Sequence, residues 1–564
     1  MEKQQITGAQ AVILSLLEEG VDTIFGYPGG AIMPIYDALY DYTDQVNHIL
    51  TRHEQGAVHA AEGYAKVTGK AGVVFATSGP GATNLLTGIA DAQIDSVPLV
   101  CITGQVASPL LGTDAFQESD MIGLSMPVTK WNYQVTCVEE IPEALAKAFY
   151  IAQTGRPGPV LIDIAKDAQF QQAEFNYKKN PKIRSYVPEL PINKTKVAEA
   201  AKLINEAKKP MLLVGQGVII ANAEKELMAF MEKTGIPAGW TLLGLSAIPT
   251  NHPLNVGMLG MHGNYGPNIK TNEADLLIAV GMRFDDRVTS IVSQYGINAK
   301  VIHLEIDPAE INKIIKADVG VVGNAKKVLP MLTELANKNS HEAWLAEYRA
   351  CDKIEYDTVI EKSISPKEGK ITMGEVVRTV SESANHDAVL VTDVGQQQMT
   401  ASRYFKFTRS KSNVTSGGLG TMGFGIPSSI GAQIGAKDRT VVCFVGDGGF
   451  QMTLQELGTI VQNKLPIKII ILNNNFLGMV RQWQEMFFER RYSFTELQNP
   501  DFVAITKGFG MAAHKVERRE DLAAGVETMM KHDGPYLLEV VVEKEENVFP
   551  MVPVGSSISD IRLE

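Results

Sequence analysis

Short apolar runs alternate along the chain with segments whose apolar residues recur at helical spacing. Residues 8–19 carry such a helical pattern and are followed by Gly20, a residue type common at helix C-termini. The runs 73–76 and 97–103 are almost continuously apolar, as expected for strands that are buried on both faces. Strands of this kind between helices predict a parallel sheet covered by helices on both sides.

This alternation recurs in three blocks, which predict domains at 1–180, 190–340 and 370–564. A chain of 564 residues is longer than one hydrophobic core usually serves. A polar stretch at 170–195 is interpreted as a linker, and a second charged stretch at 340–370 precedes the third block. The predicted fold class is therefore α/β, with three doubly wound parallel-sheet domains.

Composition narrows the function classes. The net charge of −12 argues against a general nucleic-acid-binding protein. The four cysteines are scattered and form no CxxC pair, which favours a reducing compartment over a zinc or disulfide framework. We expect no membrane span, because no run of about 18 apolar residues occurs. The opening sequence MEKQQITGAQ has no signal or transit pattern, so we expect a cytoplasmic protein.

The most informative motifs are a GDG triplet and an NN pair that directly follow the apolar runs 440–445 and 467–472. A helix pattern lies between the two runs, so they form a βαβ unit whose strands are expected to be parallel neighbours. Asp447 and Asn474 would then meet at the carboxyl edge of the sheet, where open α/β sheets bind ligands. Carboxylate and amide oxygens suit Mg²⁺ that also binds phosphate oxygens, and a helix starting after Gly448 suits a diphosphate.

These motifs resemble those of thiamine-diphosphate enzymes. The resemblance implies Asp447 and Asn474 as Mg²⁺ ligands, with the main-chain carbonyl of Phe476 as the third. It also implies that Gln396 approaches the diphosphate. Acetohydroxyacid synthases usually read GQHQ there, whereas this chain has Gln397 in place of the histidine.

The sequence RHEQGA at 52–57 lies at a predicted strand-to-helix junction. The resemblance makes Glu54 the acid that hydrogen-bonds the cofactor's aminopyrimidine ring. It further implies that the carbonyl of Gly420 meets the amino group of that ring and that Met422 supports the bent cofactor. The remaining cofactor contacts that it implies are Gly30, Pro80, Asn84, Gly448, Gly449 and Met479.

The resemblance also implies that the site is composite, because Glu54 and Asp447 belong to different blocks that come from different subunits in this family. A homodimer is then the smallest active unit, with a homotetramer as the larger possibility.

The middle block contains LGMHG at 259–263 and GMRFDDRVT at 281–289, which resemble flavin-binding signatures of acetohydroxyacid synthases. In this family FAD is structural. The FAD contacts implied are Arg156, Gly215, Gly217, His262, Gly263, Gly281, Arg283, Asp285, Glu305, Asp307 and Asn324.

Substrate residues follow from the same resemblance. Arg287 is the favoured cation for a 2-keto-acid carboxylate, which a guanidinium can bind through two hydrogen bonds. Trp483 would pack on the ethyl group of 2-ketobutyrate, Lys166 would line the entrance, and the tail 549–553 would cover the site. The other implied catalytic and substrate residues are Gln117, Ala31, Phe116 and Met261.

The resemblance spans about residues 7–561 and implies the acetohydroxyacid synthase reaction. Pyruvate is decarboxylated on thiamine diphosphate, and the hydroxyethyl unit is joined to pyruvate or 2-ketobutyrate, giving 2-acetolactate or 2-aceto-2-hydroxybutyrate for branched-chain amino acid synthesis. A small regulatory subunit is the implied partner. A pyruvate oxidase or decarboxylase on the same scaffold, and a non-catalytic protein of this fold, remain as alternatives.

Overall fold

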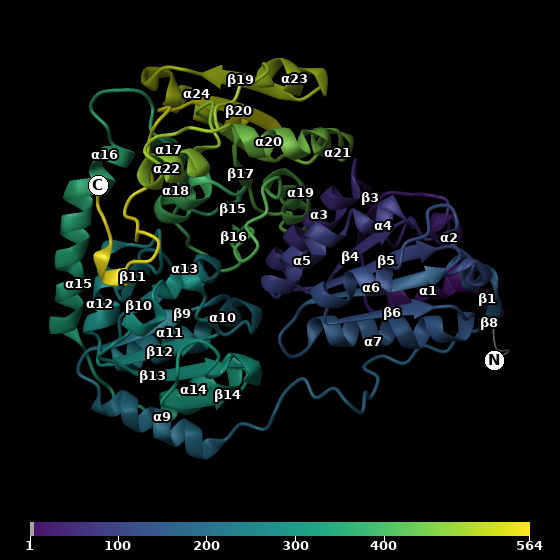
Figure 1. Ribbon diagram of the computed structural model, residues 1–564, viewed down its shortest axis with the longest axis horizontal. Helices are drawn as coiled ribbons and strands as arrows, with labels where there is room; N and C mark the ends of the chain where they lie inside the picture. The colour runs from purple at the N-terminus through teal and green to yellow at the C-terminus, as the bar shows by residue number, and fades with distance from the viewer. Residues whose placement is uncertain (1–4) are drawn as a thin grey trace.

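Three six-stranded sheets organise the computed structural model, which describes residues 5–564. All strand pairings within these sheets are parallel. Figure 1 shows the first domain on the right, the central domain at the lower left and the third domain above it, each with helices around its strands. The predicted α/β class with three parallel-sheet domains is confirmed.

The sheet of the first domain has the order β3-β2-β4-β5-β7-β6. Its strands are β2 (Thr23–Gly26), β3 (Asn47–Leu50), β4 (Gly72–Ala76), β5 (Leu99–Gln105), β6 (Trp131–Val135) and β7 (Pro159–Ala165), and its main helices are α1 (Gly8–Glu18), α3 (Glu54–Thr68), α5 (Leu86–Ile94) and α7 (Ile141–Gln153). Val73 packs in the core formed with α1 and α7, whereas the next residue, Val74, packs in the core formed with α3 and α5. The strands are continuously apolar because both faces of the sheet are covered.

The other two sheets repeat this design. The central sheet has the order β11-β10-β9-β12-β13-β14, and the third has the order β16-β15-β17-β18-β20-β19. The central strands are β9 (Pro210–Val214), β10 (Ala238–Trp240), β11 (Asn255–Met258), β12 (Leu276–Val280), β13 (Lys300–Glu305) and β14 (Val319–Val322). The third-domain strands are β15 (Val389–Thr392), β16 (Asn413–Val414), β17 (Val441–Gly446), β18 (Lys468–Asn473), β19 (Ala512–Val516) and β20 (Tyr536–Val541). The predicted strands at 440–445 and 467–472 correspond to β17 and β18.

Helix α3 joins the first domain to the third by packing along α19 (Gly425–Gly435). Glycines allow this close approach: a Cβ on Gly431 would lie 1.7 Å from the carbonyl oxygen of Ala60, and one on Gly63 would lie 2.0 Å from that of Ser428. Any larger side chain would push the two helices apart. Because α3 begins at Glu54, this contact fixes where the predicted catalytic acid sits relative to the third domain of its own chain.

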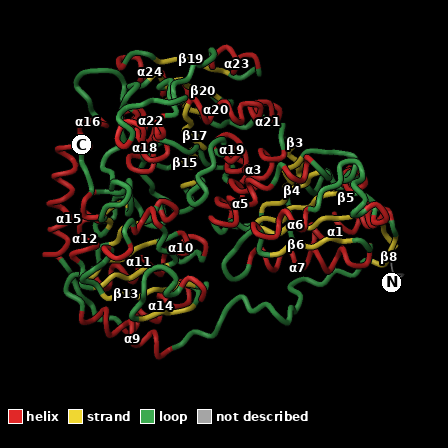
Figure 2. Tube along the Cα trace, viewed as in Figure 1, coloured by secondary structure: helices red, strands yellow, loops and turns green. Residues whose placement is uncertain are grey.

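Two segments between domains differ in character. The charged stretch at 340–370 is largely helical, and α15 (Glu342–Glu355) buries Trp344 in the core of the central domain. In the predicted linker, β8 (Gln172–Glu174) pairs with β1 (Gln5–Thr7), and a long loop then leads to α9 (Lys194–Glu206), as Figure 2 shows at its lower edge. Between residues 5 and 564, none of the helices combines the length and apolarity needed to cross a membrane.

The C-terminal segment returns from the third domain to the central one. Val552 N donates to the carbonyl oxygen of Met261 at 2.8 Å, and Asn272 Nδ2 donates to Ser559 Oγ at 2.8 Å. Ile558 is part of the same apolar core as Trp344. The tail is therefore packed against the central domain and passes beside Met261, one of the predicted substrate residues.

Arg403, on α18 (Gln396–Tyr404), joins the third and central domains through a buried ion pair with Glu355. Both side chains are 1% exposed, and Arg403 also donates to the carbonyl oxygen of Gly263 at 2.9 Å. We expect Arg403→Met to lower the free energy of unfolding by about 3–5 kcal/mol, because Glu355 would stay buried without its cation. Urea unfolding followed by circular dichroism checks this. Arg518→Met, at an exposed ion pair, is the control, and an equally small change for both variants would contradict the expectation.

Candidate active site

Asp447 is the first residue of α20 (Asp447–Thr453), directly after β17, and is 1% exposed. Strands β17 and β18 are parallel neighbours with Gly446 opposite Leu472, which confirms that Asp447 and Asn474 share one sheet edge. Burial raises the pKa of Asp447 to about 6, although hydrogen bonds from Asn499 and from backbone amides lower it. A buried carboxylate with neutral partners is held in its charged form most easily by a bound cation.

Asn474 and Phe476 complete the set of predicted ligands. Asn474 is 4% exposed, and its Oδ1 accepts a hydrogen bond from Phe476 N at 3.1 Å. Both residues line a pocket of about 40 Å³ together with Asp447. A carboxylate, an amide oxygen and a main-chain carbonyl are the hard oxygen donors that Mg²⁺ prefers, so the donor chemistry fits that ion.

Glycines shape the same pocket. A Cβ on Gly448 would lie 2.6 Å from a side-chain carbon of Leu477, and one on Gly449 would lie 2.4 Å from Asp393 Oδ1. The predicted residues Gln396, Gly448, Gly449 and Met479 line this pocket, and so does Gln397. The backbone therefore carries no side chains at the positions that a diphosphate would approach. This fits the predicted binding of thiamine diphosphate.

A larger cavity of about 1600 Å³ adjoins this pocket, and the two share the lining residues Val394, Gly395, Met422, Met479 and Val480. Gly420 also lines the cavity and has a φ of 72°, a backbone conformation that favours glycine. The structure thus brings the residues predicted to support the cofactor rings next to those predicted to hold its diphosphate.

The rest of the large cavity lies along the central domain. Of the predicted FAD residues, eight line it: Arg156, Gly217, His262, Gly281, Arg283, Asp285, Glu305 and Asn324. His262 Nδ1 is buried without a partner among residues 5–564, and burial, helped by nearby arginines, lowers its pKa to about 3. Burial raises the pKa of Glu305 to about 7. A neutral, unpaired imidazole nitrogen in a cavity wall fits a polar cofactor.

Three predicted FAD residues do not line the cavity. A Cβ on Gly215 would lie 2.1 Å from the carbonyl oxygen of Gly281, so this glycine permits close packing of the β9 and β12 turns. Gly263 offers its carbonyl oxygen to Arg403. Asp307 caps a short helix and lies 3.4 Å from Arg156 across the boundary between the first and central domains. Each of the three therefore contacts a residue that lines the cavity, namely Gly281, Met258 or Arg156.

Arg287, Met261 and Trp483 gather where the cavity approaches α22 (Gly478–Phe487). The guanidinium carbon of Arg287 lies 6.0 Å from the centre of the Trp483 ring. Arg287 Nη1 lies 3.8 Å from Met261 Sδ. A cation therefore stands beside an apolar wall, an arrangement suited to a small carboxylate with an alkyl chain.

Apart from the FAD residue Arg156, the predicted residues of the first domain lie outside both cavities. Neither cavity is lined by Gly30, Ala31, Glu54, Pro80, Asn84, Phe116, Gln117 or Lys166. Asn84 Nδ2 donates to Glu54 Oε2 at 3.0 Å, so two of these residues do meet. Phe116 is 88% exposed, and Gln117 and Pro80 are also exposed. Within one chain, the predicted residues therefore fall into two groups, one in the first domain and one along the two cavities, which we call half-sites.

Comparison with known proteins decides the family. The thiamine pyrophosphate enzyme N-terminal TPP binding domain, central domain and C-terminal TPP binding domain match residues 6–124, 197–332 and 393–540. The chain is 47% identical to the acetolactate synthase isozyme 2 large subunit of Escherichia coli K12 over 557 residues, covering 99% of both chains. It belongs to the acetolactate synthase large-subunit family. This membership also makes it a thiamine-pyrophosphate enzyme.

Two further relatives in the acetolactate synthase family are also matched over nearly the whole chain. The large subunit of Corynebacterium glutamicum is 47% identical, with 99% of this chain and 90% of the relative covered. A probable large subunit of Methanocaldococcus jannaschii is 44% identical, with 98% and 95% covered. The likeness thus extends over all three domains and over both half-sites.

In this member of the acetolactate synthase family, two residues contact the predicted site although the sequence did not predict a role for them. Asn499 Nδ2 donates to Asp447 Oδ2 at 2.7 Å and thereby orients the predicted metal ligand. Gln482 Oε1 accepts a hydrogen bond from Gln396 Nε2 at 2.9 Å. Gln482 lies on α22 and Asn499 in a polar loop, and neither belongs to a spacing that would indicate contact with the site.

A second group with metal-binding residue types, His59, Glu62 and Asp91, is buried between the first and third domains. Lys66 lies beside it, and the lysine Nζ donates to Asp95 at 2.8 Å. Burial raises the pKa of Glu62 well above its usual range. Because Lys66 already supplies positive charge, we assign this group to domain packing.

Proposed function

We propose that the chain is the catalytic subunit of an acetolactate synthase that uses thiamine diphosphate, Mg²⁺ and FAD. It would join pyruvate to a second pyruvate or to 2-ketobutyrate, giving 2-acetolactate or 2-aceto-2-hydroxybutyrate. The observation that carries this proposal is the buried pair Asp447 and Asn474 at neighbouring strand ends, beside a cavity that contains Arg287 and Trp483. Family membership points to the same reaction.

Each group of residues has a defined task in the reaction. When bound, thiamine diphosphate supplies the nucleophilic carbon and accepts the electrons released by decarboxylation. Asp447, Asn474 and the carbonyl of Phe476 would hold the Mg²⁺ that anchors the diphosphate. Arg287 would bind and orient the acceptor carboxylate, and the apolar wall with Trp483 excludes water from the reacting groups.

Glu54 would hold a proton against the pyrimidine ring of the cofactor. Its Oε2 accepts from Asn84, which leaves Oε1 as the atom for this task. A Cβ on Gly81 would lie 3.2 Å from Glu54 Oε1, so the glycine leaves that oxygen open. Hydrogen bonding of a carboxylic acid to a ring nitrogen is ordinary general acid–base chemistry.

FAD would occupy the central-domain part of the large cavity. The unpaired His262 Nδ1 and the eight lining residues named above support this assignment. We propose a structural role for FAD, because the ligation requires no net change of oxidation state.

The two half-sites support an active unit of at least two copies, in which Glu54 of one chain faces Asp447 of the other. The half-site surface of the first domain carries exposed apolar side chains, with Tyr27 at 41%, Met33 at 51% and Phe116 at 88%. A second copy would cover such a surface. Relatives carry the name large subunit, so we also propose a small regulatory partner. A cytoplasmic location remains a prediction, in keeping with four free cysteines.

Product analysis tests the function. The purified chain is incubated with pyruvate, thiamine diphosphate, Mg²⁺ and FAD, and acetolactate is converted by acid to acetoin for detection. We expect acetoin to be formed only when both thiamine diphosphate and Mg²⁺ are present. Acetaldehyde, acetate or acetyl phosphate without acetolactate would instead favour a decarboxylase or an oxidase.

We expect Trp483→Leu to reduce the preference for 2-ketobutyrate over pyruvate by about tenfold, the scale on which an apolar pocket discriminates one methylene. The indole is the flat surface beside Arg287 on which an ethyl group could pack. Competition between the two acceptors, with both products quantified, measures the ratio. Trp131→Leu makes the same change in the first domain, on a ring that stacks with Tyr133, and should leave the ratio unchanged. An unaltered ratio in Trp483→Leu would remove this residue from acceptor choice.

A further inference from the structure

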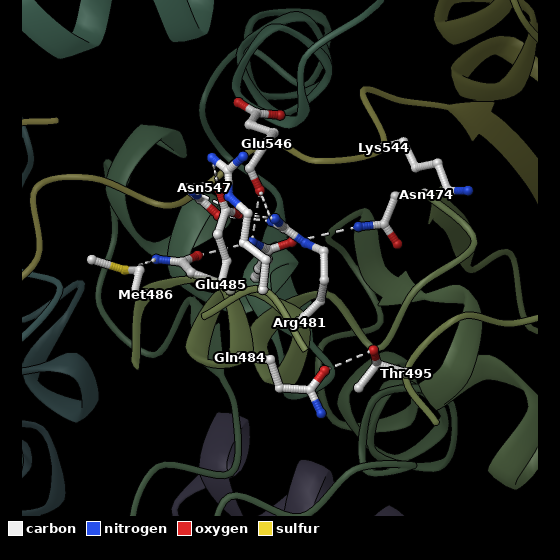
Figure 3. Close-up of polar contacts among 12 residues, drawn as sticks. Asn474, Arg481, Gln484, Glu485, Met486, Thr495, Lys544, Glu546 and Asn547 are labelled. Atoms are coloured by element: carbon white, nitrogen blue, oxygen red, sulfur yellow. Dashed lines mark hydrogen bonds and ion pairs between the residues drawn. The ribbon is translucent and has the colours of Figure 1, made fainter. Parts of the chain in front are cut away.

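Three buried side-chain amides follow one another from the C-terminal segment to the predicted metal site. They belong to Gln482, Gln396 and Asn474, which are 0%, 1% and 4% exposed. Figure 3 shows Asn474 on one side of this contact network and the segment with Glu546 and Asn547 on the other. Because an amide has a donor end and an acceptor end, each member can fix the orientation of the next.

The first amide, Gln482, is held by the backbone of Val548 at both ends. Val548 N donates to Gln482 Oε1 at 2.9 Å, and Gln482 Nε2 donates to Val548 O at 3.2 Å. Rotating the amide by 180° would set donor against donor and acceptor against acceptor. One backbone residue therefore determines which end of Gln482 faces Gln396.

The second amide, Gln396, has both of its N–H groups in use. Gln396 Nε2 donates to Gln482 Oε1 at 2.9 Å and to the carbonyl oxygen of Glu546 at 2.8 Å. The reversed amide would direct its oxygen at two acceptors in a buried site, which is unfavourable. Gln396 Oε1 must therefore point the other way, toward Asn474. Its side-chain nitrogen is not free to contact a diphosphate.

The third amide is the predicted metal ligand itself. Asn474 Nδ2 lies 3.4 Å from Gln396 Oε1, so Asn474 Oδ1 is directed to the opposite side, where it accepts from Phe476 N. Gly478 leaves room for this contact, because a Cβ there would lie 2.2 Å from Gln396 Oε1 and 2.9 Å from Asn474 Nδ2.

Arg481 holds the segment at 546–547, whose backbone in turn orients Gln396. It is 0% exposed, and its Nη2 donates to the carbonyl oxygen of Glu546 at 2.8 Å and to Asn547 Oδ1 at 2.7 Å. The same carbonyl oxygen of Glu546 also accepts the hydrogen bond from Gln396 Nε2. Figure 3 shows Arg481 among the labelled residues Glu485, Glu546 and Asn547.

We propose that Gln482 is a positioning residue for the metal site: through Gln396 it turns the oxygen of Asn474 toward the cation. It thereby makes Mg²⁺ affinity depend on the attachment of the segment at 546–548 to α22. The inference rests on the proposed function, since it takes Asn474 to be a Mg²⁺ ligand. Gln482 need not touch substrate or cofactor to have this effect.

The test uses Gln482→Met, which keeps the length of the side chain but removes both ends of the amide. Gln433→Met is the matched control, because Gln433 is a buried glutamine of the third domain, 5% exposed, that donates to Arg439 O. Mg²⁺ is titrated calorimetrically into the full-length metal-free protein in the presence of thiamine diphosphate. We expect Mg²⁺ to bind about 10- to 100-fold more weakly to Gln482→Met, as for other partners of metal ligands, and normally to the control.

A second variant separates positioning from a general loss of packing. Gln396→Met breaks the next contact in the same series, the one between Gln396 and Asn474. The double variant with both substitutions should therefore bind Mg²⁺ no more weakly than the single variant that has the lower Mg²⁺ affinity. Additive losses, or equal losses in Gln482→Met and Gln433→Met, would overturn the proposal. If Gln482→Met does not fold, normal Mg²⁺ affinity in Gln396→Met would overturn it as well. Failure of the unaltered protein to bind Mg²⁺ with thiamine diphosphate would count against the proposed function instead.

Discussion

Asp447→Asn should weaken Mg²⁺ binding by at least about 100-fold and abolish turnover at millimolar Mg²⁺, because it removes the charge of the only acidic member of the proposed ligand set. The amide keeps the size of the side chain and can still accept from Asn499, so folding should be preserved. Calorimetric titration of Mg²⁺ in the presence of thiamine diphosphate measures the affinity. The dependence of acetolactate formation on Mg²⁺ measures the consequence.

Asp438→Asn provides the control for this prediction, because Asp438 is an exposed residue just before β17 in the same domain. It should leave both Mg²⁺ affinity and turnover unchanged. Unaltered Mg²⁺ binding in Asp447→Asn would mean that the cation is held elsewhere.

Glu54→Gln should lower turnover by about 10²- to 10⁴-fold, the range typical of a lost general acid–base group. Glutamine retains an oxygen that can accept from Asn84 but cannot carry the proton that the pyrimidine ring requires. Cofactor affinity should change only a few-fold, since we propose that residues of the third domain hold the diphosphate. Steady-state kinetics together with calorimetric binding of thiamine diphosphate separates the two effects.

Glu143→Gln, on the exposed face of α7, is the matched control and should behave as the unaltered protein. Near-normal turnover in Glu54→Gln would show that another group performs the proton transfer. A large loss of cofactor affinity without loss of turnover at saturation would assign Glu54 to binding alone.

The sequence predicts the shared sheet edge of Asp447 and Asn474 correctly because the information for it is local. Asp447 and Asn474 each follow an apolar strand, and the βαβ connection leaves only one arrangement in which both strand ends meet. The same logic gives three parallel sheets, since continuously apolar strands require helices on both faces. The pattern cannot show which side chains hold these two residues in place. Gln396 and Gln482 are 86 positions apart, and no periodicity links them.

Other differences have similar causes. The stretch 340–370 is rich in charged residues, so its sequence does not reveal that α15 buries Trp344 in the core of the central domain. Gly215 and Gly263 occur in turns that resemble cofactor contacts, yet packing against Gly281 and Met258 explains why both must be glycine. In each case tertiary packing, which depends on distant residues, decides the role of a local motif.

We propose that the active site forms between two chains, with Glu54 from one and Asp447 from the other. Chains that carry Glu54→Gln and chains that carry Asp447→Asn can be co-expressed in equal amounts and purified together. If the site is shared, half of the dimers are mixed and each holds one intact site, so about a quarter of unaltered activity should return. Activity that stays at the level of the separate variants would mean that both residues act within a single chain.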